Sequence, residues 1–370
     1  MRNGSTDLLM LAAELVAIPS VSHEEADLAA WMEETLSGPG HLEVTRVGDS
    51  VIARTALGRD RRLVLAGHLD TVPGPGGADA TRPPAVFAGP DVRGDVLWGL
   101  GSVDMKGGLA VLVDLAVSVQ NPDVDLTFVF YACEETDRAD NALVHLAAEQ
   151  PELIGGDAAI LAEPTGGALE AGCQGTMRAT VTVVGRAAHT ARPWVGLNAI
   201  HRLAPLLARI ADYDSRQVVI DGCRYAEQIQ AVGIEGGIAS NVVPDSASVT
   251  VNYRFAPDRS VQDAELELRR YLDLSLDAGA GDMLAVMDAA PGAPPSLGHP
   301  LLGALASAAG VATRAKLGWT DVSTFYGAGI PAANFGPGDP LLAHTPDEHV
   351  SRSELAAARA TLGALVGEAC

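Results

Sequence analysis

The order of hydrophobic and polar positions predicts an α/β domain at the start of the chain. Mostly apolar runs at 62–66, 125–131 and 157–161 have the length of strands and no regular polar alternation, which is typical of strands buried on both faces. Segments with helical spacing lie between them, at 105–119 and 139–148. Strands that alternate with helices predict a mostly parallel sheet covered by helices.

The pattern changes from about residue 175. Segments 177–184 and 246–254 alternate between apolar and polar positions, which predicts strands of a sheet with one solvated face. Helices are predicted over 197–210 and 261–272, with a short strand near 283–287. These elements predict a smaller α+β unit with a ferredoxin-like arrangement.

The α/β pattern returns after a stretch rich in Pro and Gly at 291–296, where we predict a hinge. A strand is predicted over 330–335, and helices from about residue 301 and over 353–366. We therefore predict one domain made of 1–174 and 294–370, interrupted by an inserted domain over 175–293.

The pattern of apolar residues near the N-terminus predicts helices, and we expect no membrane segment. Leu8, Leu11 and Leu15 recur at helical spacing, and Glu14 interrupts the apolar stretch, unlike the core of a signal peptide. No segment reaches the roughly 20 apolar residues that a membrane span needs. Ser22 and the acid three residues later have the spacing of a capping box, which predicts that a second helix begins there.

Composition excludes some classes of partner. The 370 residues include 47 Asp and Glu against 25 Lys and Arg, which gives a formal charge of −22. Phosphate-rich nucleic acid and anionic membranes need basic surfaces, so we expect neither as a partner. Four cysteines are far apart in the sequence and predict no disulfide framework, which favours the cytoplasm: Cys133, Cys173, Cys223 and Cys370.

Polar side chains follow three of the predicted buried strands. His68 and Asp70 come after the first strand, an adjacent pair of glutamates after the second, and Glu163 after the third. The carboxyl ends of parallel strands form the ligand-binding edge of an open α/β sheet, so we expect these groups to lie together. Asp104, in front of a predicted helix, and His344, after the strand at 330–335, can join them.

A mixed set of imidazoles and carboxylates suits Zn²⁺, Mn²⁺ or Co²⁺, whereas Ca²⁺ and Mg²⁺ prefer oxygen alone. The set is larger than one catalytic zinc uses, and a shared carboxylate would hold two ions about 3.5–4 Å apart. Each motif taken alone also has an ordinary interpretation. The His-x-Asp pair suits a surface contact, the Glu-Glu pair a solvated face, and Asp104 a helix N-cap. Only their coincidence at one sheet edge favours a metal site.

The motifs together resemble the di-zinc metallopeptidase family that includes aminoacylases, acetylornithine deacetylase and succinyl-diaminopimelate desuccinylase. The resemblance covers nearly the whole chain and rests on 18–22 (IPSVS), 67–73 (GHLDTVP), 101–108 (GSVDMKGG), Glu134-Glu135, 162–165 (AEPT) and 343–344 (AH). Within the family, the chain most resembles actinobacterial-type desuccinylases at 170–176 (EAGCQGT), 252–260 (NYRFAPDRS), 318–321 (GWTD) and 334–340 (NFGPGDP).

The resemblance implies two divalent metal ions, namely zinc with cobalt or manganese as substitutes, and it implies which residues bind them. One ion is implied at His68, Asp104 and Glu163. The second is implied at Glu135, His344 and the shared carboxylate of Asp104. The family also has a cis peptide after the bridging Asp, which here lies between Asp104 and Met105.

The resemblance also implies catalytic roles. Asp70 does not bind the metal itself but orients the ring of the ligand His68. Glu134 is the general base. His189, in 185–192 (GRAAHTAR), donates to the developing oxyanion from the partner subunit, which implies a homodimer formed through the inserted lid domain.

Substrate contacts are implied for Asn241 and Arg254, and we add Arg178 and Arg192 as further candidates. A guanidinium can fork onto a carboxylate, so a small anionic N-acyl amino acid is the expected substrate. The implied reaction is the release of succinate from N-succinyl-LL-2,6-diaminopimelate in lysine and cell-wall precursor synthesis. Two alternatives remain open at this point. They are hydrolysis of another N-acyl amino acid or a peptide C-terminus, and a silent module that binds metal or a small molecule.

Overall fold

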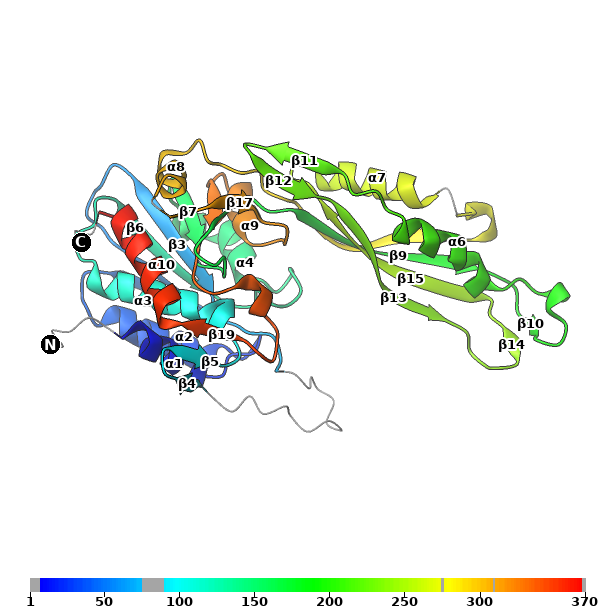
Figure 1. The fold of residues 1–370 in the computed structure, drawn as a ribbon, viewed down its shortest axis with the longest axis horizontal. Helices are drawn as coiled ribbons and strands as arrows, with labels where there is room; N and C mark the ends of the chain where they lie inside the picture. Colours follow the sequence, from blue (N-terminus) through cyan, green and yellow to red (C-terminus); the bar gives the residue numbers. More distant parts are fainter. Residues whose placement is uncertain (1–6, 75–89, 274–275, 309, 368–370) are drawn as a thin grey trace. The chain divides into compact units, whose positions relative to one another are not determined.

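The chain folds into two compact units, shown in a computed structural model that describes residues 7–74, 90–273, 276–308 and 310–367 (Figure 1). Unit 1 comprises the described residues within 1–171, 295–314 and 324–370. Unit 2 comprises 172–294 and 315–323. Cys370 lies outside the described residues.

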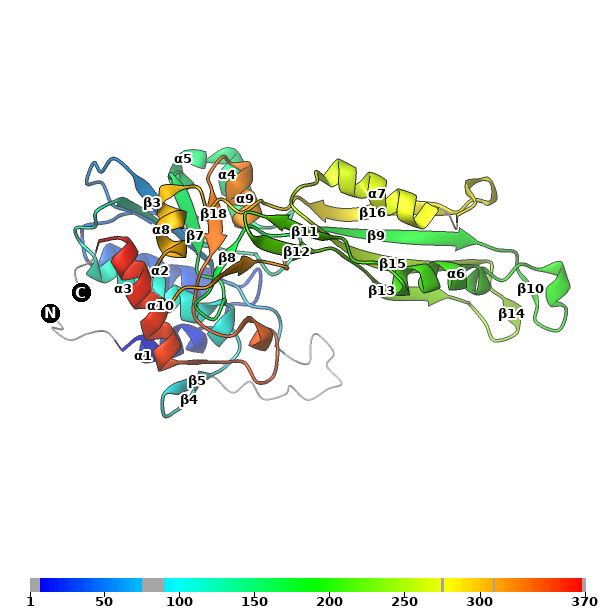
Figure 2. The same ribbon diagram turned by 45° about the horizontal axis from the view of Figure 1, so that its top comes forward.

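Unit 1 is built on a mixed sheet of eight strands in the order β1-β2-β6-β3-β7-β18-β8-β17 (Figure 2). Its four central strands are mutually parallel, because β3 pairs in parallel with β6 and β7, and β18 pairs in parallel with β7. The predicted mostly parallel sheet is therefore confirmed. The strands are β1 (Glu43–Val47), β2 (Ser50–Arg54), β3 (Arg62–His68), β6 (Asp125–Tyr131), β7 (Ala158–Leu161), β8 (Leu169–Ala171), β17 (Thr313–Ala315) and β18 (Ala332–Asn334).

Helix α3 (Gly107–Ser118) packs against the central strands, and α1, α2 and α10 pack against α3. Every residue of β6 is buried, as its apolar run predicts. Gly108 is required for the close approach of α3, because a Cβ there would lie 2.1 Å from the carbonyl oxygen of Ala162. The other α-helices of unit 1 are α1 (Leu8–Ala17), α2 (Ala26–Ser37), α4 (Ala142–Glu149), α5 (Pro151–Ile154), α8 (Pro300–Ala306) and α10 (Arg352–Leu365), and α9 (Val322–Gly327) begins in unit 2 and ends in unit 1.

Unit 2 has an antiparallel four-stranded sheet in the order β13-β15-β9-β16. The order along the chain is β9-α6-β13-β15-α7-β16, which is the ferredoxin-like topology. Alternate residues of β9 and β15 are buried under the two helices, as their alternating pattern predicts. The elements are β9 (Gly175–Val184), α6 (Ala199–Ala211), β13 (Gln228–Gly236), β15 (Ser246–Phe255), α7 (Val261–Asp273) and β16 (Met283–Ala290).

Short strands complete the described parts of both units. They form three small antiparallel sheets, one in unit 1 and two in unit 2. The strands are β4 (Asp91–Arg93), β5 (Val96–Trp98) and β19 (His349–Ser351), then β10 (Ala188–His189) with β14 (Val242–Val243), and β11 (Gln217–Ile220) with β12 (Cys223–Ala226). Among the described residues, no helix has both the length and the apolar character to cross a membrane.

The predicted capping box at Ser22 is wrong. Helix α2 begins at Ala26, and Glu25 in the N-cap position makes no capping hydrogen bond with its side chain. The Ser22 hydroxyl instead donates to Asp70 Oδ2 at 2.7 Å, and Glu25 Oε1 accepts the backbone N–H of Cys133 at 3.0 Å. Contacts with distant strands have therefore replaced the local cap.

Candidate metal centre

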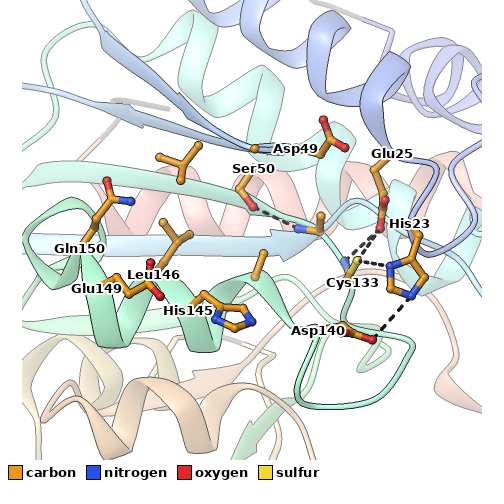
Figure 3. Close-up of a pocket in the computed structure, with 14 residues that line it drawn as sticks. His23, Glu25, Asp49, Ser50, Cys133, Asp140, His145, Leu146, Glu149 and Gln150 are labelled. Atoms are coloured by element: carbon orange, nitrogen blue, oxygen red, sulfur yellow. Dashed lines mark hydrogen bonds and ion pairs between the residues drawn. The ribbon is translucent and has the colours of Figure 1, made fainter.

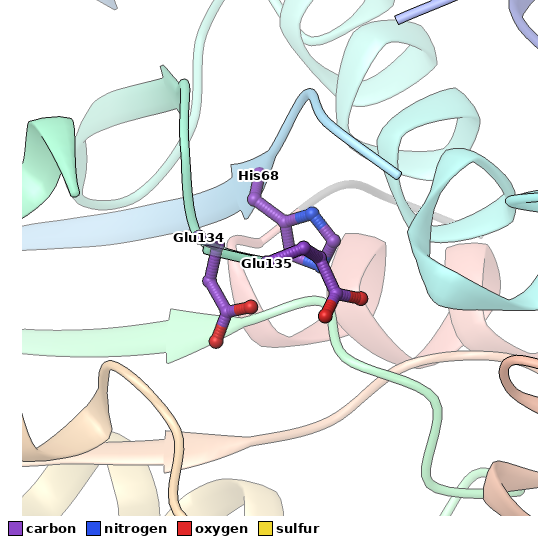
Figure 4. Close-up of side chains that lie close together, drawn as sticks. All are labelled: His68, Glu134 and Glu135. Carbon is purple, nitrogen blue, oxygen red and sulfur yellow. The ribbon is translucent and has the colours of Figure 1, made fainter. Parts of the chain in front are cut away.

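The parallel pairing of three strands aligns their carboxyl ends. His68 is the last residue of β3 and pairs with Tyr131, the last residue of β6. Glu134 and Glu135 follow β6 directly, and Figure 4 shows their side chains next to His68 (Figure 4). Glu163 follows β7, whose last residue also pairs with β3. The sheet therefore brings these groups to one edge, as the sequence predicts.

Three groups of side chains in the described part of the chain place nitrogen and oxygen atoms within 4.8 Å of one another, as a metal site requires. Two of the groups share Asp104. The groups are His68 with Asp104 and Glu163, Asp104 with Glu135 and His344, and His68 with Glu134 and Glu135.

The two oxygens of Asp104 face different imidazoles. Oδ1 lies 3.1 Å from His68 Nε2, and Oδ2 lies 3.6 Å from His344 Nε2. His344 Nε2 is also 2.7 Å from Glu135 Oε1. Asp104 has extended backbone angles and is followed by a cis peptide, and α3 has Lys106 at its N-cap position, so Asp104 is not the N-cap of α3. A carboxylate with one oxygen toward each imidazole has the geometry of a bridge between two ions.

The electrostatics of this cluster favour positive charge. A hydrogen bond with Glu135 raises the pKa of His344 to about 9. Burial alone would lower the pKa of His68, but the carboxylates of Asp104 and Asp70 outweigh burial and raise it well above its usual value. Several carboxylates thus converge on these imidazoles and favour a positive charge beside them, and divalent cations with nitrogen and oxygen ligands fit the same donor set.

Asp70 connects the imidazole to the glutamate segment. Its main-chain oxygen lies 3.0 Å from His68 Nδ1, and its carboxylate oxygens accept the backbone N–H groups of Glu134 at 3.0 Å and Glu135 at 2.9 Å. Burial would raise the pKa of Asp70, but the interactions with His68 and these amides lower it to about 2. The main-chain oxygen of Asp70 therefore orients the ring of His68, and its buried carboxylate holds the segment that carries Glu134 and Glu135.

Glu348 supports Asp104 and was not predicted from the sequence. It is 1% exposed, and its Oε1 accepts the backbone N–H groups of Val103 at 2.9 Å and Asp104 at 3.1 Å. Burial raises the pKa of Glu348 to about 7. The only sequence signal is an acid four residues after His344, and that spacing predicts nothing without knowledge of the tertiary contact.

The predicted residues of unit 2 form two separate groups. His189 in β10 and Asn241 before β14 are close, since the N–H of Thr190 donates to the Asn241 carbonyl at 3.1 Å and β10 pairs with β14. The N–H of Arg192 donates to the His189 carbonyl at 2.8 Å, and all three side chains are exposed.

Arg178 and Arg254 lie on the central strands instead. Arg178 is in β9 opposite Asn252, and Arg254 is two residues further along β15. About six residues of β9 separate Arg178 from the end of the strand that leads to His189, which corresponds to roughly 20 Å. Unit 2 by itself therefore does not bring His189 next to these arginines.

We predict that Glu348 controls metal affinity through Asp104. In Glu348→Leu, two buried N–H groups lose their acceptor at a cost of about 1–3 kcal/mol each, and metal affinity falls about 10–100-fold. Glu348→Gln keeps an acceptor oxygen and retains most of the affinity. The measurement is zinc binding in competition with a chelator, with circular dichroism as a check of folding. A folded Leu variant with unchanged affinity contradicts the role.

Curated relatives match almost the whole chain. A succinyl-diaminopimelate desuccinylase of Corynebacterium glutamicum is 44% identical over 92% of this chain and 91% of its own length. A protein of Mycobacterium tuberculosis strain H37Rv, to which the same name is given provisionally, is 48% identical over 95% of this chain and 96% of its own length.

Solved structures share the fold at low identity. A tripeptidase from Staphylococcus aureus superposes with a TM-score of 0.79 at 20% identity and covers 98% of both chains. A sequence model described as peptidase family M20/M25/M40 matches residues 64–368, a range that contains every residue of the three donor groups. The chain therefore belongs to peptidase family M20/M25/M40.

Proposed function

We propose that the chain is a zinc-dependent amidohydrolase that releases succinate from N-succinyl-LL-2,6-diaminopimelate. The observation that carries the proposal is the carboxylate of Asp104, which faces one imidazole with each oxygen. This arrangement occurs in a chain 44% identical to the Corynebacterium glutamicum desuccinylase. His68, Asp104 and Glu163 would hold one ion, and Glu135, His344 and Asp104 the other.

The reaction needs a base beside the water that attacks the amide. Two divalent ions held by these ligands would polarise the amide carbonyl and acidify a water molecule. Glu134 is next to the ligand Glu135, and its N–H is fixed by Asp70, so its carboxylate takes the water proton. The water oxygen adds to the carbonyl carbon, the C–N bond breaks, and Glu134 delivers the proton to the leaving amine.

Arg254 is the proposed contact for a substrate carboxylate. Its Nε donates to Asn252 Oδ1 at 3.0 Å, and among the described residues no carboxylate pairs with its guanidinium. The side chain of Arg254 is partly buried, and this burial lowers its pKa. A partly desolvated guanidinium without an acid partner favours a bidentate carboxylate. Asn241, Arg178 and Arg192 remain predicted contacts of the same substrate.

His189 is the proposed donor to the developing oxyanion, supplied by a second copy of the chain. Support for a homodimer comes from β13, which is the edge strand of the unit 2 sheet. Most of its residues are exposed, including Val232 at 59% and Ile234 at 57%. An exposed apolar edge strand is a natural site for pairing with another copy.

We predict that Glu134→Gln abolishes turnover while the protein keeps its metal. Loss of the general base lowers kcat for the succinylated substrate by about 10²–10⁴-fold, because proton transfer contributes that much. Succinate release measures the rate, and elemental analysis measures the metal. Glu152→Gln, an exposed acid on α5, is the matched control and keeps native kcat.

The same assay distinguishes the alternatives. Wild-type protein loaded with zinc should have its highest kcat/KM for the succinylated diamino acid in a panel that includes N-acetylornithine and peptides. A preference for another member of the panel contradicts the proposed substrate, and unchanged kcat in Glu134→Gln contradicts the mechanism. A protein that binds metal and hydrolyses nothing in the panel contradicts both.

We predict that Arg254→Gln raises KM for the succinylated substrate by tenfold or more, since a charge-assisted bidentate contact is worth about 1.5–3 kcal/mol. The change in kcat should be smaller, because Arg254 contacts a part of the substrate that does not react. Arg224→Gln, on the exposed face of β12, is the control. An equal KM in the two variants contradicts the assignment.

We predict that two inactive variants complement each other if His189 acts across the dimer. A 1:1 mixture of His189→Ala and Glu134→Gln should regain roughly a quarter of native activity, because half of the dimers carry one intact site. Ile234→Asp should yield a monomer by light scattering and remove the complementation. If the mixture stays as inactive as its components while dimers form, His189 does not act in trans.

A further inference from the structure

The backbone N–H groups that follow β6 donate to side chains and not to a neighbouring strand. The last residue of β6, Tyr131, still accepts the N–H of Leu69 at 2.7 Å with its carbonyl oxygen. Each of the next four N–H groups, from 132 to 135, donates to a side-chain oxygen. In that order the acceptors are Ser50 Oγ at 3.3 Å, Glu25 Oε1 at 3.0 Å, Asp70 Oδ1 at 3.0 Å and Asp70 Oδ2 at 2.9 Å. The path of this segment therefore depends on three side chains.

Cys133 has an unusual backbone conformation within this segment. Its φ of 59° lies in the left-handed region, which is unfavourable for a residue that has a Cβ atom. Glu25 Oε1 accepts its N–H at 3.0 Å and its thiol at 3.4 Å, as Figure 3 shows (Figure 3). These two contacts hold Cys133 in a conformation that its own preferences disfavour.

Glu25 lowers the stability of the fold in the place where it stands. Its side chain is fully buried, and Oε2 makes no hydrogen bond with any described residue. A buried polar atom without a partner is unfavourable, and exceptions of this kind are expected where a residue serves a functional site. The contacts of Oε1 with Cys133 indicate what that service is.

A cavity of about 360 Å³ lies beside this segment in unit 1. Glu25 and Cys133 line it, together with the turn between β1 and β2 and helix α4. Closely packed side chains restrain a segment, whereas a cavity leaves it room to move. Removal of the hydrogen bond to Glu25 therefore lets Cys133 relax, and the residues that follow it change direction.

We propose that Glu25 is a positioning residue for Glu134 and Glu135. By holding Cys133 in the left-handed conformation, it sets the direction in which the next two side chains leave the sheet, toward His68. Its effect on hydrolysis rests on the proposed function, in which Glu134 is the base. Its effect on metal affinity acts through the donor Glu135 and is independent of the substrate.

The first comparison tests the acceptor oxygen of Glu25. Glu25→Met keeps the length of the side chain but has no oxygen, and it should lower zinc affinity and kcat by about tenfold or more. Glu25→Gln keeps an acceptor and should retain most of both. The control is Asp157→Ala, which removes the acceptor of one backbone N–H at the start of β3, that of Arg62, and should change neither. Zinc affinity is measured in competition with a chelator, and kcat by succinate release.

The second comparison tests the backbone mechanism, because glycine adopts a positive φ without a steric penalty. In a Cys133→Gly background, Glu25→Met should lower zinc affinity and kcat only slightly. In a Cys133→Ala background, which lacks the thiol but keeps Cβ, the losses should be as large as in the wild type. A merely structural role of Glu25 would not distinguish the two backgrounds.

Circular dichroism checks that each variant folds. If Glu25→Met does not fold, Glu25→Asp, whose side chain is one methylene shorter, replaces it in both backgrounds. Unchanged zinc affinity and kcat in the folded variant, or equal losses in the Gly and Ala backgrounds, overturn the proposal. Zinc affinity that depends on Glu25 in this way, in a protein that hydrolyses no substrate, supports the positioning role and contradicts the proposed function.

Discussion

Carboxylates converge at one edge of the unit 1 sheet, and their mutual repulsion is the constraint around which the site is arranged. Asp104 stands between His68 and His344, and Glu135 contacts His344 from the other side. Like charges at this separation and degree of burial cannot all remain ionised without compensation. The raised pKa values of both imidazoles show that compensation, and divalent ions would replace those protons with a larger charge.

The surrounding structure holds these charges in place with backbone amides. Asp70 accepts the two amides of the glutamate pair, and Glu348 accepts the amide of Asp104. Gly108 lets α3 approach the end of β7, where Glu163 follows. Buried carboxylates and close backbone packing thus hold the segments that carry the metal donors.

The sequence predicts the carboxyl edge of the unit 1 sheet well. The strands are apolar runs, so the polar residues that directly follow them are easily recognised as candidate ligands. Prediction fails where a local pattern competes with tertiary contacts. The pattern Ser-x-x-Glu forms a true capping box at Ser351 and Glu354, in front of α10. The same pattern at Ser22 and Glu25 forms none, because both side chains bond to residues that follow distant strands. Glu348 escapes prediction for a similar reason, because the backbone amides that it accepts, those of Val103 and Asp104, are remote in sequence.

Unit 2 shows a different limit of prediction. Its ferredoxin-like order follows from the alternating strands, but His189 and Arg254 lie in separate parts of it. Whether they serve one substrate depends on how units and copies of the chain assemble, which neither residue spacing nor strand pairing determines.

Asp104 is proposed to bridge two ions, and metal content after exhaustive dialysis tests this bridge most directly. We expect two zinc ions per chain in the wild type. Folded Asp104→Ala should retain fewer than one, because it removes a ligand from both ions at once. A wild type that binds a single ion, or an Asp104→Ala variant that still binds two, would contradict the account.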